Sequence, residues 1–198
     1  METPLLEQLI QAFCCLPGIG AKSAKRMAFY LLEQDRSGGK QLALILDQAI
    51  NEIGQCQNCR ILTEDKLCQL CANPKRDNAQ LCIVQTPADV LAIESATQFE
   101  GHYFVLGGHI SPLDGMGPED IGLDILEKRM QEGQLNEIIL ATNPTIEGQA
   151  TAHYIHEKAK KYQIKVSRIA FGVPLGGELE FVDGGTLSHA FTDRHYYP

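Results

Sequence analysis

Four cysteines in the sequence have the spacing of a metal site. Cys56, Cys59, Cys68 and Cys71 follow the pattern C-x2-C-x8-C-x2-C in the stretch CQNCRILTEDKLCQLC. Two residues between thiols let both sulfurs of a pair reach one ion from a tight turn, and two such turns complete a tetrahedral site. Four thiolates leave no open position for catalysis, so the pattern predicts a structural Zn2+ ion. The alternative is four unrelated buried or redox-active thiols.

The remaining cysteines and the N-terminus bear on the compartment. Cys14, Cys15 and Cys82 lie in helix and strand patterns and are predicted to be inert core thiols. The N-terminal stretch METPLLEQLIQAF carries acids rather than the basic residues of a signal peptide. No stretch of the sequence is long and apolar enough to span a bilayer. We therefore expect a cytoplasmic protein, in which thiols and metal ligation are favoured over disulfides.

A second stretch, LPGIGAKSAKR, resembles a helix-hairpin-helix. Gly18 and Gly20 allow a tight turn and keep side chains away from the backbone. The N–H groups that open the following helix then point outward, where the helix dipole favours an anion. Lys22, Lys25 and Arg26 follow within two turns, so the stretch predicts sequence-independent contact with DNA phosphates. The alternative is a plain helix–helix turn with a solvated basic face.

A third stretch, LATNPTIEG at 140–148, follows the apolar run EIILA. Its polar side chains, Asn143, Thr145 and Glu147, fall at the carboxyl edge of a predicted sheet, where α/β proteins bind ligands. Metal-dependent phosphoryl transfer needs several carboxylates to converge at such an edge. The first predicted strand ends in Gln85, however, and amides and hydroxyls are poor partners for Mg2+.

Four acids could still gather at this edge: Asp89, Glu94, Asp114 and Glu147. We interpret them as solvated surface and helix caps, and we expect no catalytic residue among them.

The elements that position these groups follow from the apolar periodicity. Residues 4–14, 21–33 and 40–53 have helical patterns, with RSGG at 36–39 predicted as a loop and a polar boundary at 73–78. Strands then alternate with helices, which indicates a mostly parallel sheet. The expected strands are 81–85, 102–107, 137–142 and 165–171. Three helices are expected between the strands. The first follows a cap at Thr86, the second begins at Glu119 and Asp120, and the third covers 147–162. The tail, GGELEFVDGGTLSHAF, predicts one more strand and a short helix.

The charge is unevenly distributed. The net charge of −8 by itself argues against a nucleic-acid partner. Residues 1–76 hold nine Lys/Arg and eight Asp/Glu, net +1, whereas residues 77–198 hold eight Lys/Arg and seventeen Asp/Glu, net −9. No acid lies between Glu7 and Glu33. A local basic patch matters more for phosphate contact than the total charge, so the N-terminal part remains a candidate for DNA binding.

Taken in this order, the stretches resemble the RecR family of bacterial recombination mediators. The matching segments are LPGIGAKSAKRMAFYLL, the four cysteines, TPADVLAIE, FVLGGHISPLDGMGPEDIGLD, ATNPTIEG and GVPLGGELEFVDGGTLSHAF. The resemblance covers nearly the whole chain. It implies an α/β protein with a helical helix-hairpin-helix region at 1–54, a four-cysteine zinc finger at 55–72, a Toprim domain at 79–174 and a C-terminal segment at 175–198.

The resemblance also implies function. A RecR-family protein acts in recombinational repair with RecO and RecF, loading the recombinase onto gapped single-stranded DNA at the nucleoid, as a ring-shaped homo-oligomer that is commonly tetrameric. Toprim enzymes carry a Glu after the first strand and Asp-x-Asp after the third, where this chain has Gln85, Asn143 and Thr145. We therefore expect a non-catalytic docking module that meets a basic partner through Glu147 and then Asp89. The alternatives are a Toprim nuclease or primase-like enzyme, and a zinc-stabilised adaptor without DNA contact.

Overall fold

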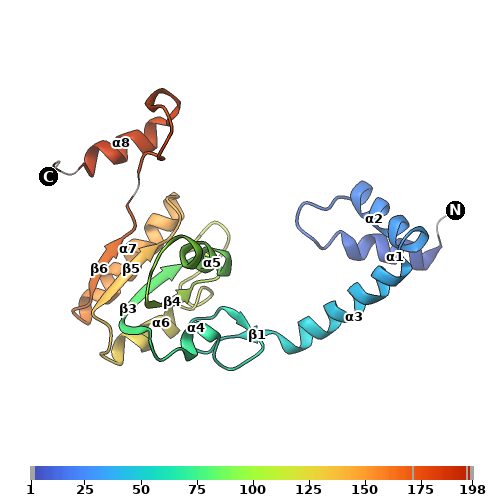
Figure 1. Ribbon diagram of the computed structural model, residues 1–198, viewed down its shortest axis with the longest axis horizontal. Helices are drawn as coiled ribbons and strands as arrows, with labels where there is room; N and C mark the ends of the chain where they lie inside the picture. Colours follow the sequence, from blue (N-terminus) through green and yellow to red (C-terminus); the bar gives the residue numbers. More distant parts are fainter. Residues whose placement is uncertain (1–2, 171, 195, 197–198) are drawn as a thin grey trace. The chain divides into compact units, whose positions relative to one another are not determined.

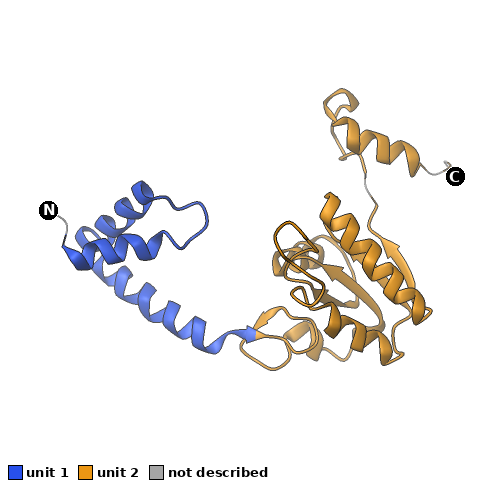
Figure 2. Ribbon diagram, turned by 180° about the vertical axis from the view of Figure 1, so that it is seen from behind, with its two compact units in different colours: residues 1–54 blue, residues 55–198 orange. Residues whose placement is uncertain are grey.

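The computed structural model describes residues 3–170, 172–194 and 196, and Figure 1 shows its helices and strands in chain order. The chain divides into two units, residues 1–54 and residues 55–198 (Figure 2). The first unit is built of three helices, and the second is built around a four-stranded parallel sheet with helices on both faces. The predicted fold class, α/β with a helical N-terminal part, is confirmed.

Three helices form the first unit: α1 (Pro4–Phe13), α2 (Ala21–Glu33) and α3 (Arg36–Glu52). Thr3 caps α1, because its hydroxyl accepts a hydrogen bond from the N–H of Leu6 at 3.3 Å. α1 packs against α2 around the buried side chains of Ile10, Ala24 and Ala28. Since alanine is small, the two helices can approach closely at this contact, which holds the turn between them in place.

The prediction of a loop at RSGG, residues 36–39, is wrong, because α3 begins at Arg36. The carboxylate of Asp35 accepts hydrogen bonds from the N–H of Gly38 at 2.8 Å and from the hydroxyl of Ser37 at 3.0 Å. These bonds satisfy a backbone donor that has no partner inside the helix. The cap outweighs the poor helix propensity of glycine, which is about 1 kcal/mol less favourable than alanine at each position.

The second unit is organised on a parallel sheet with the strand order β4-β3-β5-β6. The strands are β3 (Asp77–Val84), β4 (Gly101–Val105), β5 (Glu137–Ala141) and β6 (Lys165–Arg168). The register pairs Val84 with both Val105 and Ala141. The residues that follow these three strands therefore emerge together at one carboxyl edge of the sheet. β3 starts earlier than the predicted strand at 81–85, inside the polar stretch 73–78.

Helices cover both faces of this sheet: α5 (Pro87–Ala96), α6 (Leu123–Gln131) and α7 (Ile146–Lys161). Leu81 and Ile83 of β3 pack in one cluster with residues of α6 and α7. Cys82 and Val84 point to the opposite face and cluster with Val90 of α5. The alternation of β3 side chains thus separates two cores. No helix among the described residues is both long enough and apolar enough to cross a membrane.

A small cysteine-bearing segment precedes the sheet. It contains the paired strands β1 (Gly54–Gln55) and β2 (Leu62–Thr63) and the short helix α4 (Gln69–Ala72). Its residues Ile61 and Leu70 pack against the cluster that lies under α5. The segment is therefore attached to the sheet through an apolar contact as well as through the chain.

The three cysteines outside this segment differ in burial. Cys82 is a core thiol as predicted, and burial raises its pKa to about 12. Cys14 is half-buried against the core of the first unit. Cys15 is exposed, so the prediction of a core thiol is wrong there, because Cys15 lies just after the end of α1 and outside its apolar face.

Two further predictions are wrong. The helix expected to open at Glu119 and Asp120 begins at Leu123, because Gly122 at a φ of 77° precedes it and Asp120 instead accepts a hydrogen bond from the N–H of Gly117 at 2.7 Å. The described part of the tail contains a 3-10 turn, η1 (Leu179–Phe181), and α8 (Gly184–Thr192), but no strand. A strand needs a neighbouring strand to pair with, and Asp183 caps α8 directly after η1.

The strand predicted at 165–171 is shorter in the structure and ends at Arg168, and Phe171 lies outside the described residues.

Candidate metal centre and nucleic-acid interface

The sulfur atoms of Cys56, Cys59, Cys68 and Cys71 converge on one point. All four Sγ atoms lie within 4.8 Å of one another, and those of Cys59 and Cys68 are 3.4 Å apart. A tetrahedral ion with metal–sulfur bonds of about 2.3 Å holds its sulfurs about 3.8 Å apart. The cluster could therefore hold a metal ion after small side-chain adjustments. In the described part of the chain it is the one group of three or more His, Cys, Asp or Glu with such geometry.

Backbone hydrogen bonds shape each cysteine pair into a turn. The N–H of Cys56 donates to the carbonyl of Ile61 at 2.8 Å, and the N–H of Arg60 donates to the carbonyl of Cys56 at 2.9 Å. The N–H of Cys68 lies 3.4 Å from Sγ of Cys56. Cys68 then caps α4, which carries Cys71. These turns point backbone donors at sulfur, an arrangement that stabilises a thiolate.

The environment separates the acidities of the thiols. Burial raises the pKa of Cys56, but hydrogen bonds from the backbone of Cys68, Cys59 and Asn58 outweigh it and lower the pKa to about 7. The hydrogen bond with Cys71, together with burial, raises the pKa of Cys59 far above its usual range. Burial is also the main reason that the pKa of Cys68 rises to about 11. One thiolate forms readily, whereas further ones crowd negative charge, so a bound cation is what would allow all four to lose their protons.

Three arginines cover the outer backbone of β4. Counted along the strand, every second carbonyl accepts a guanidinium hydrogen bond: Gly101 from Arg76 at 2.6 Å, Tyr103 from Arg129 at 3.3 Å and Val105 from Arg60 at 3.2 Å. Because alternate residues of a strand point the same way, these are the carbonyls that face away from β3. The outer side of β4 is thus bonded to side chains rather than to another strand.

Two of these arginines, Arg60 and Arg129, also join the cysteine segment to the sheet. Arg60 belongs to the segment and bonds Val105, and Arg129 on α6 donates to the carbonyl of Asn58 at 3.3 Å. A backbone bond adds to them, because the N–H of Val105 donates to the carbonyl of Cys59 at 2.8 Å. Burial lowers the pKa of Arg129, and the nearby cysteines oppose this shift, Cys71 most of all. Sequence reasoning missed Arg60 and Arg129. The signal available for Arg60 was its place directly after the first C-x2-C pair.

The predicted nucleic-acid interface lies on the first unit. Gly18 has a φ of 76°, in the left-handed region that favours glycine, and Gly20 precedes α2 without any side-chain cap. A Cβ at Gly20 would meet nothing within 4 Å, so the space in front of the helix is open. Lys22, Lys25 and Arg26 are exposed, and the first turn of α2 contains no acid. The structure therefore brings the three cations and both glycines onto one turn and the helix that follows it.

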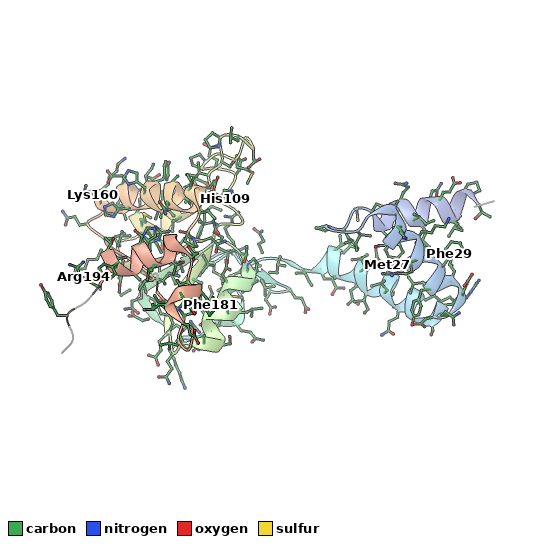
Figure 3. All side chains as sticks on the ribbon, turned by 90° about the horizontal axis from the view of Figure 1, so that it is seen from above. Met27, Phe29, His109, Lys160, Phe181 and Arg194 are labelled. Atoms are coloured by element: carbon green, nitrogen blue, oxygen red, sulfur yellow. The ribbon has the colours of Figure 1, made fainter. Side chains whose placement is uncertain are left out.

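An apolar groove of about 360 Å3 runs beside this region on the same unit. Met27 lines it, and Figure 3 labels this residue on α2 together with Phe29. The lining residues are Phe13, Arg26, Met27, Tyr30, Leu31 and Leu42. The cationic face of α2 is thus next to an apolar one.

The carboxyl edge of the sheet brings Gln85 and Asn143 together. Gln85 is 4% exposed, and its Oε1 accepts a hydrogen bond from the N–H of Asn143 at 3.3 Å. The hydroxyl of Thr145 caps α7 by accepting from the N–H of Gly148 at 3.1 Å. Glu147 follows in the first turn of α7 and is half-buried. At two of the positions where Toprim enzymes carry acids, the side chains of Gln85 and Thr145 therefore accept structural hydrogen bonds here.

The other acids of this region are engaged separately. Asp89 accepts a hydrogen bond from the N–H of Thr86 at 2.7 Å and completes a capping box at the start of α5. Glu94 forms an ion pair with Arg76 and accepts from the hydroxyl of Tyr103 at 2.6 Å. The ion pair, against the opposing effect of burial, keeps the pKa of Glu94 low. Asp114 accepts from the hydroxyl of Ser111 at 2.6 Å. The structure does not bring these carboxylates together.

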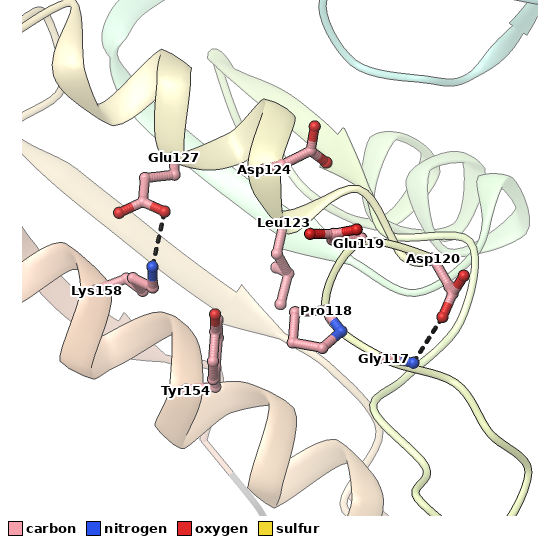
Figure 4. A pocket seen from close by; sticks show the side chains of 9 residues that line it. All are labelled: Gly117, Pro118, Glu119, Asp120, Leu123, Asp124, Glu127, Tyr154 and Lys158. Carbon is pink, nitrogen blue, oxygen red and sulfur yellow. Dashed lines mark hydrogen bonds and ion pairs between the residues drawn. The ribbon is translucent and has the colours of Figure 1, made fainter.

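A different set of acids does gather, in a pocket of about 390 Å3 shown in Figure 4. We call it the acidic pocket. Its lining residues are Gly117, Pro118, Glu119, Asp120, Leu123, Asp124, Glu127, Tyr154 and Lys158. Lys158 on α7 pairs with Glu127 on α6 at 2.7 Å, so the pocket already accommodates one cationic side chain.

Comparison with protein families agrees with this architecture. A model described as RecR, helix-hairpin-helix, matches residues 6–50, and one described as Toprim domain matches residues 79–170. A model described as RecR, C-terminal, matches residues 172–195. The chain therefore belongs to the RecR family, and the resemblance noted from the sequence is confirmed. Its domains indicate a role in DNA recombination and repair, and the helix-hairpin-helix indicates DNA binding.

Proposed function

We propose that the protein is a recombination mediator that binds the DNA backbone through Gly18, Gly20, Lys22, Lys25 and Arg26. One observation carries this proposal: an uncapped, acid-free helix N-terminus with three exposed cations around it. Outward N–H groups and lysine or arginine side chains are what phosphate oxygens bind. The protein binds gapped DNA independently of its base sequence. It does so in the cytoplasm, at the nucleoid.

Salt-dependent DNA binding tests this interface. The double variant Lys22→Ala/Arg26→Ala is expected to lower the slope of log affinity against log salt by about two, one for each lost phosphate contact. The matched control Lys161→Ala/Lys165→Ala removes two exposed cations from the second unit and should leave the slope unchanged. If both double variants bind gapped DNA like the wild type at moderate salt, the α2 patch is only a solvated face.

Gly20→Ala is a finer test of the same interface. Its Cβ would enter open space, so the fold should not change, but the added methyl group stands where a phosphate would approach the N–H groups of α2. We expect weaker DNA binding with unchanged thermal stability. Equal binding would show that phosphate contacts come from the side chains alone.

The four cysteines bind structural zinc in this proposal. The support is the donor set: four sulfurs that converge, without a carboxylate or imidazole, suit Zn2+ and leave no position open for catalysis. When bound, the ion supplies folding free energy to residues 55–72 rather than chemistry. Elemental analysis of the purified protein should find one zinc per chain, and its absence would contradict the proposal.

The Toprim domain, taken as residues 79–174, serves as a docking module without catalysis. The support is that Gln85, Asn143 and Thr145 replace the acids of Toprim enzymes, and that the side chains of Gln85 and Thr145 accept backbone hydrogen bonds from Asn143 and Gly148. Residues 77–198 carry a net charge of −9, which repels DNA phosphates and suits a basic partner. RecO and RecF are the proposed partners, with Glu147 first among the contacting acids and Asp89 second.

Charge reversal at Glu147 tests the docking role. Glu147→Lys should weaken RecO binding, and the affinity should fall with salt because complementary charges mainly steer the encounter. Glu157→Lys places the same reversal at an exposed position further along α7 and is the matched control. Asp89 is less informative, since its carboxylate also caps α5. Mg2+-dependent cleavage or primer synthesis that Glu147→Lys abolishes would overturn the docking assignment.

The chain assembles into a homo-oligomeric ring, with a tetramer as the proposed state. The support is the apolar surface of α3, on which Leu44, Leu46 and Ile50 are exposed, and of the C-terminal segment, taken as residues 175–198, where Leu175 and Phe181 are exposed. Large exposed apolar surfaces commonly mark association sites. The molar mass from light scattering, with and without gapped DNA, should correspond to four chains, and a monomer under both conditions would contradict the ring.

A further inference from the structure

Arg60 belongs to the metal site by its backbone and to the Toprim domain by its side chain. Its N–H closes the first cysteine turn on the carbonyl of Cys56, and its φ of 65° lies in the left-handed region. That conformation is unfavourable for a residue with a side chain. The surroundings must therefore hold Arg60 in place, and the contacts of its guanidinium explain how.

The guanidinium reaches three backbone carbonyls that lie far along the chain. Nη1 lies 2.8 Å from the oxygen of Leu106 and 3.2 Å from that of Val105, and it also donates to the carbonyl of Ile121. Cζ lies 5.8 Å from the centre of the Phe104 ring. Arg60 thus bridges the end of β4 to the end of the long loop that precedes α6. We call residues 107–122 the β4–α6 loop.

Gly122 makes room for this bridge. Its own φ is 77°, and a Cβ placed on it would come within 2.6 Å of Cζ of Arg60. The obstacle is a side chain whose three carbonyl bonds fix its position, so it cannot simply swing aside. A glycine at 122 is therefore required both by the backbone conformation and by the guanidinium of Arg60.

We infer that Arg60 is a positioning residue that couples metal binding at the four cysteines to the order of the β4–α6 loop. A bound ion fixes the first cysteine turn, the turn fixes the left-handed backbone of Arg60, and the guanidinium then holds Leu106 and Ile121. Since linkage between two sites is reciprocal, a change in the loop must alter metal affinity. The inference rests on the proposed zinc site and extends it to residues outside the four ligands.

The coupling reaches the wall of the acidic pocket. Residues 117–120 and Leu123, Asp124 and Glu127 line the acidic pocket, and Ile121, which Arg60 holds, lies between them. Asp124 also interacts electrostatically with Arg60, opposing the lowering of the arginine pKa by burial. Loss of the ion would therefore disturb the pocket wall, although no ligand of the ion lies in the pocket.

Two glycine variants separate this coupling from ordinary strain. Gly122→Ala and Gly115→Ala both put a side chain at a positive φ, 77° and 71°, but a Cβ at Gly115 meets nothing within 4 Å. We expect Gly122→Ala to weaken Zn2+ affinity about 10- to 100-fold, the range for outer-shell partners of metal ligands. Gly115→Ala should stay within about twofold of the wild type. The measurement is competition with a chromophoric chelator, using Zn2+ alone.

A double-variant cycle shows whether Gly122 acts through Arg60. Arg60→Ala should itself weaken Zn2+ binding, and adding Gly122→Ala to it should cause no further loss, because the obstructed guanidinium is gone. Hydrogen exchange of residues 105–122 should slow on Zn2+ addition in the wild type and change less in Arg60→Ala. Equal Zn2+ affinities of the wild type and Gly122→Ala, or an equal Gly122→Ala loss in both backgrounds, would overturn the coupling. A wild type that binds no Zn2+ would overturn the zinc site as well.

Discussion

The four-cysteine site and the carboxyl edge of the Toprim sheet are two places where ligand-type residues could gather, and they gather at only one. At the cysteines, four Sγ atoms lie within 4.8 Å of one another. At the sheet edge, Asp89 caps a helix, Glu94 pairs with Arg76, and Gln85 and Asn143 bond to each other. A sheet edge of the kind that presents metal ligands in other proteins is therefore not by itself a metal site.

The difference lies in what each donor does before any ion arrives. The thiols of the cluster are bonded mainly to one another and to the turns that carry them, so a cation gains all four. Three of the four acids, Asp89, Glu94 and Asp114, already have a structural partner that a cation would have to displace, which leaves Glu147 as a single carboxylate in the first turn of α7. A metal centre therefore needs donor atoms that converge on one point and that are not already bonded to other parts of the structure.

The largest expected effect comes from removing one thiol. Cys59→Ser should lose the ion and the order of residues 55–72, because structural zinc contributes an apparent 10–16 kcal/mol in zinc-finger peptides. Elemental analysis and hydrogen exchange would measure both losses, and the helices of the first unit should keep their protection. Cys15→Ser, at an exposed thiol outside the cluster, is the control. Full metal content in Cys59→Ser would remove the contrast between the two regions.

The second largest effect is expected at the carboxyl edge of the sheet, where a substitution that causes steric overlap should lower stability without involving a metal. A Cβ on Gly148 would come within 3.2 Å of the carbonyl carbon of Asn143 and closer still to its oxygen. Gly148→Ala should therefore cost about 1–3 kcal/mol of unfolding free energy in urea. Gly184→Ala, where a Cβ meets nothing within 4 Å, should change it by less than about 0.5 kcal/mol. Equal midpoints would mean that the edge is softer than its contacts indicate.

Restoring acids to the edge should make the two regions more alike. The triple variant Gln85→Glu/Asn143→Asp/Thr145→Asp supplies three carboxylates, and aspartate at 145 can still cap α7. At a tenfold excess over its dissociation constant, Mg2+ should add about 1.4 kcal/mol to the unfolding free energy. The wild type should show no such gain. Stabilisation of the wild type by Mg2+ to the same extent would show that the natural edge binds the ion.

The smallest expected effect concerns a proton. His102 on β4 is buried, and burial, then Arg129 and Arg76, lower its pKa, with Asp77 opposing them. When the pH falls below the ordinary histidine pKa of 6.5, His102 is protonated in the unfolded chain but stays neutral in the folded one. The free energy of unfolding therefore decreases as the pH drops. His102→Gln should flatten this slope in urea unfolding of the zinc-loaded protein. An unchanged slope would assign the acid sensitivity to other groups.

The parts that sequence patterns predicted are those defined by near neighbours in the chain. Four cysteines within sixteen residues determine a shared point because the turns between them are short, and the apolar runs at 81–85 and 137–142 identify strands without knowledge of their partners. Helix boundaries were harder: one Asp35 carboxylate extends α3 through two glycines, and one left-handed Gly122 delays α6.

Contacts between distant residues were not predictable in the same way. Arg60 meets Ile121, 61 residues later, and Arg129 meets Asn58, 71 residues earlier. Such pairs exist only after the sheet has formed, so no local spacing marks them. The tail strand failed for the related reason that a strand requires a neighbour, which the sequence could not supply for residues 176–181.

The arginines along β4 have a further consequence, for the behaviour of the chain in concentrated solution. β4 is an outermost strand, and all five of its residues are buried. Outermost strands with free N–H and C=O groups recruit other extended segments, which is a common start of aggregation. Here Arg76, Arg129 and Arg60 occupy the outward carbonyls, and Cys59 takes the N–H of Val105. Within the cysteine segment, Arg60 and Cys59 occupy the Val105 end of β4, so disorder of this segment should leave that end of the strand open to pairing with other chains.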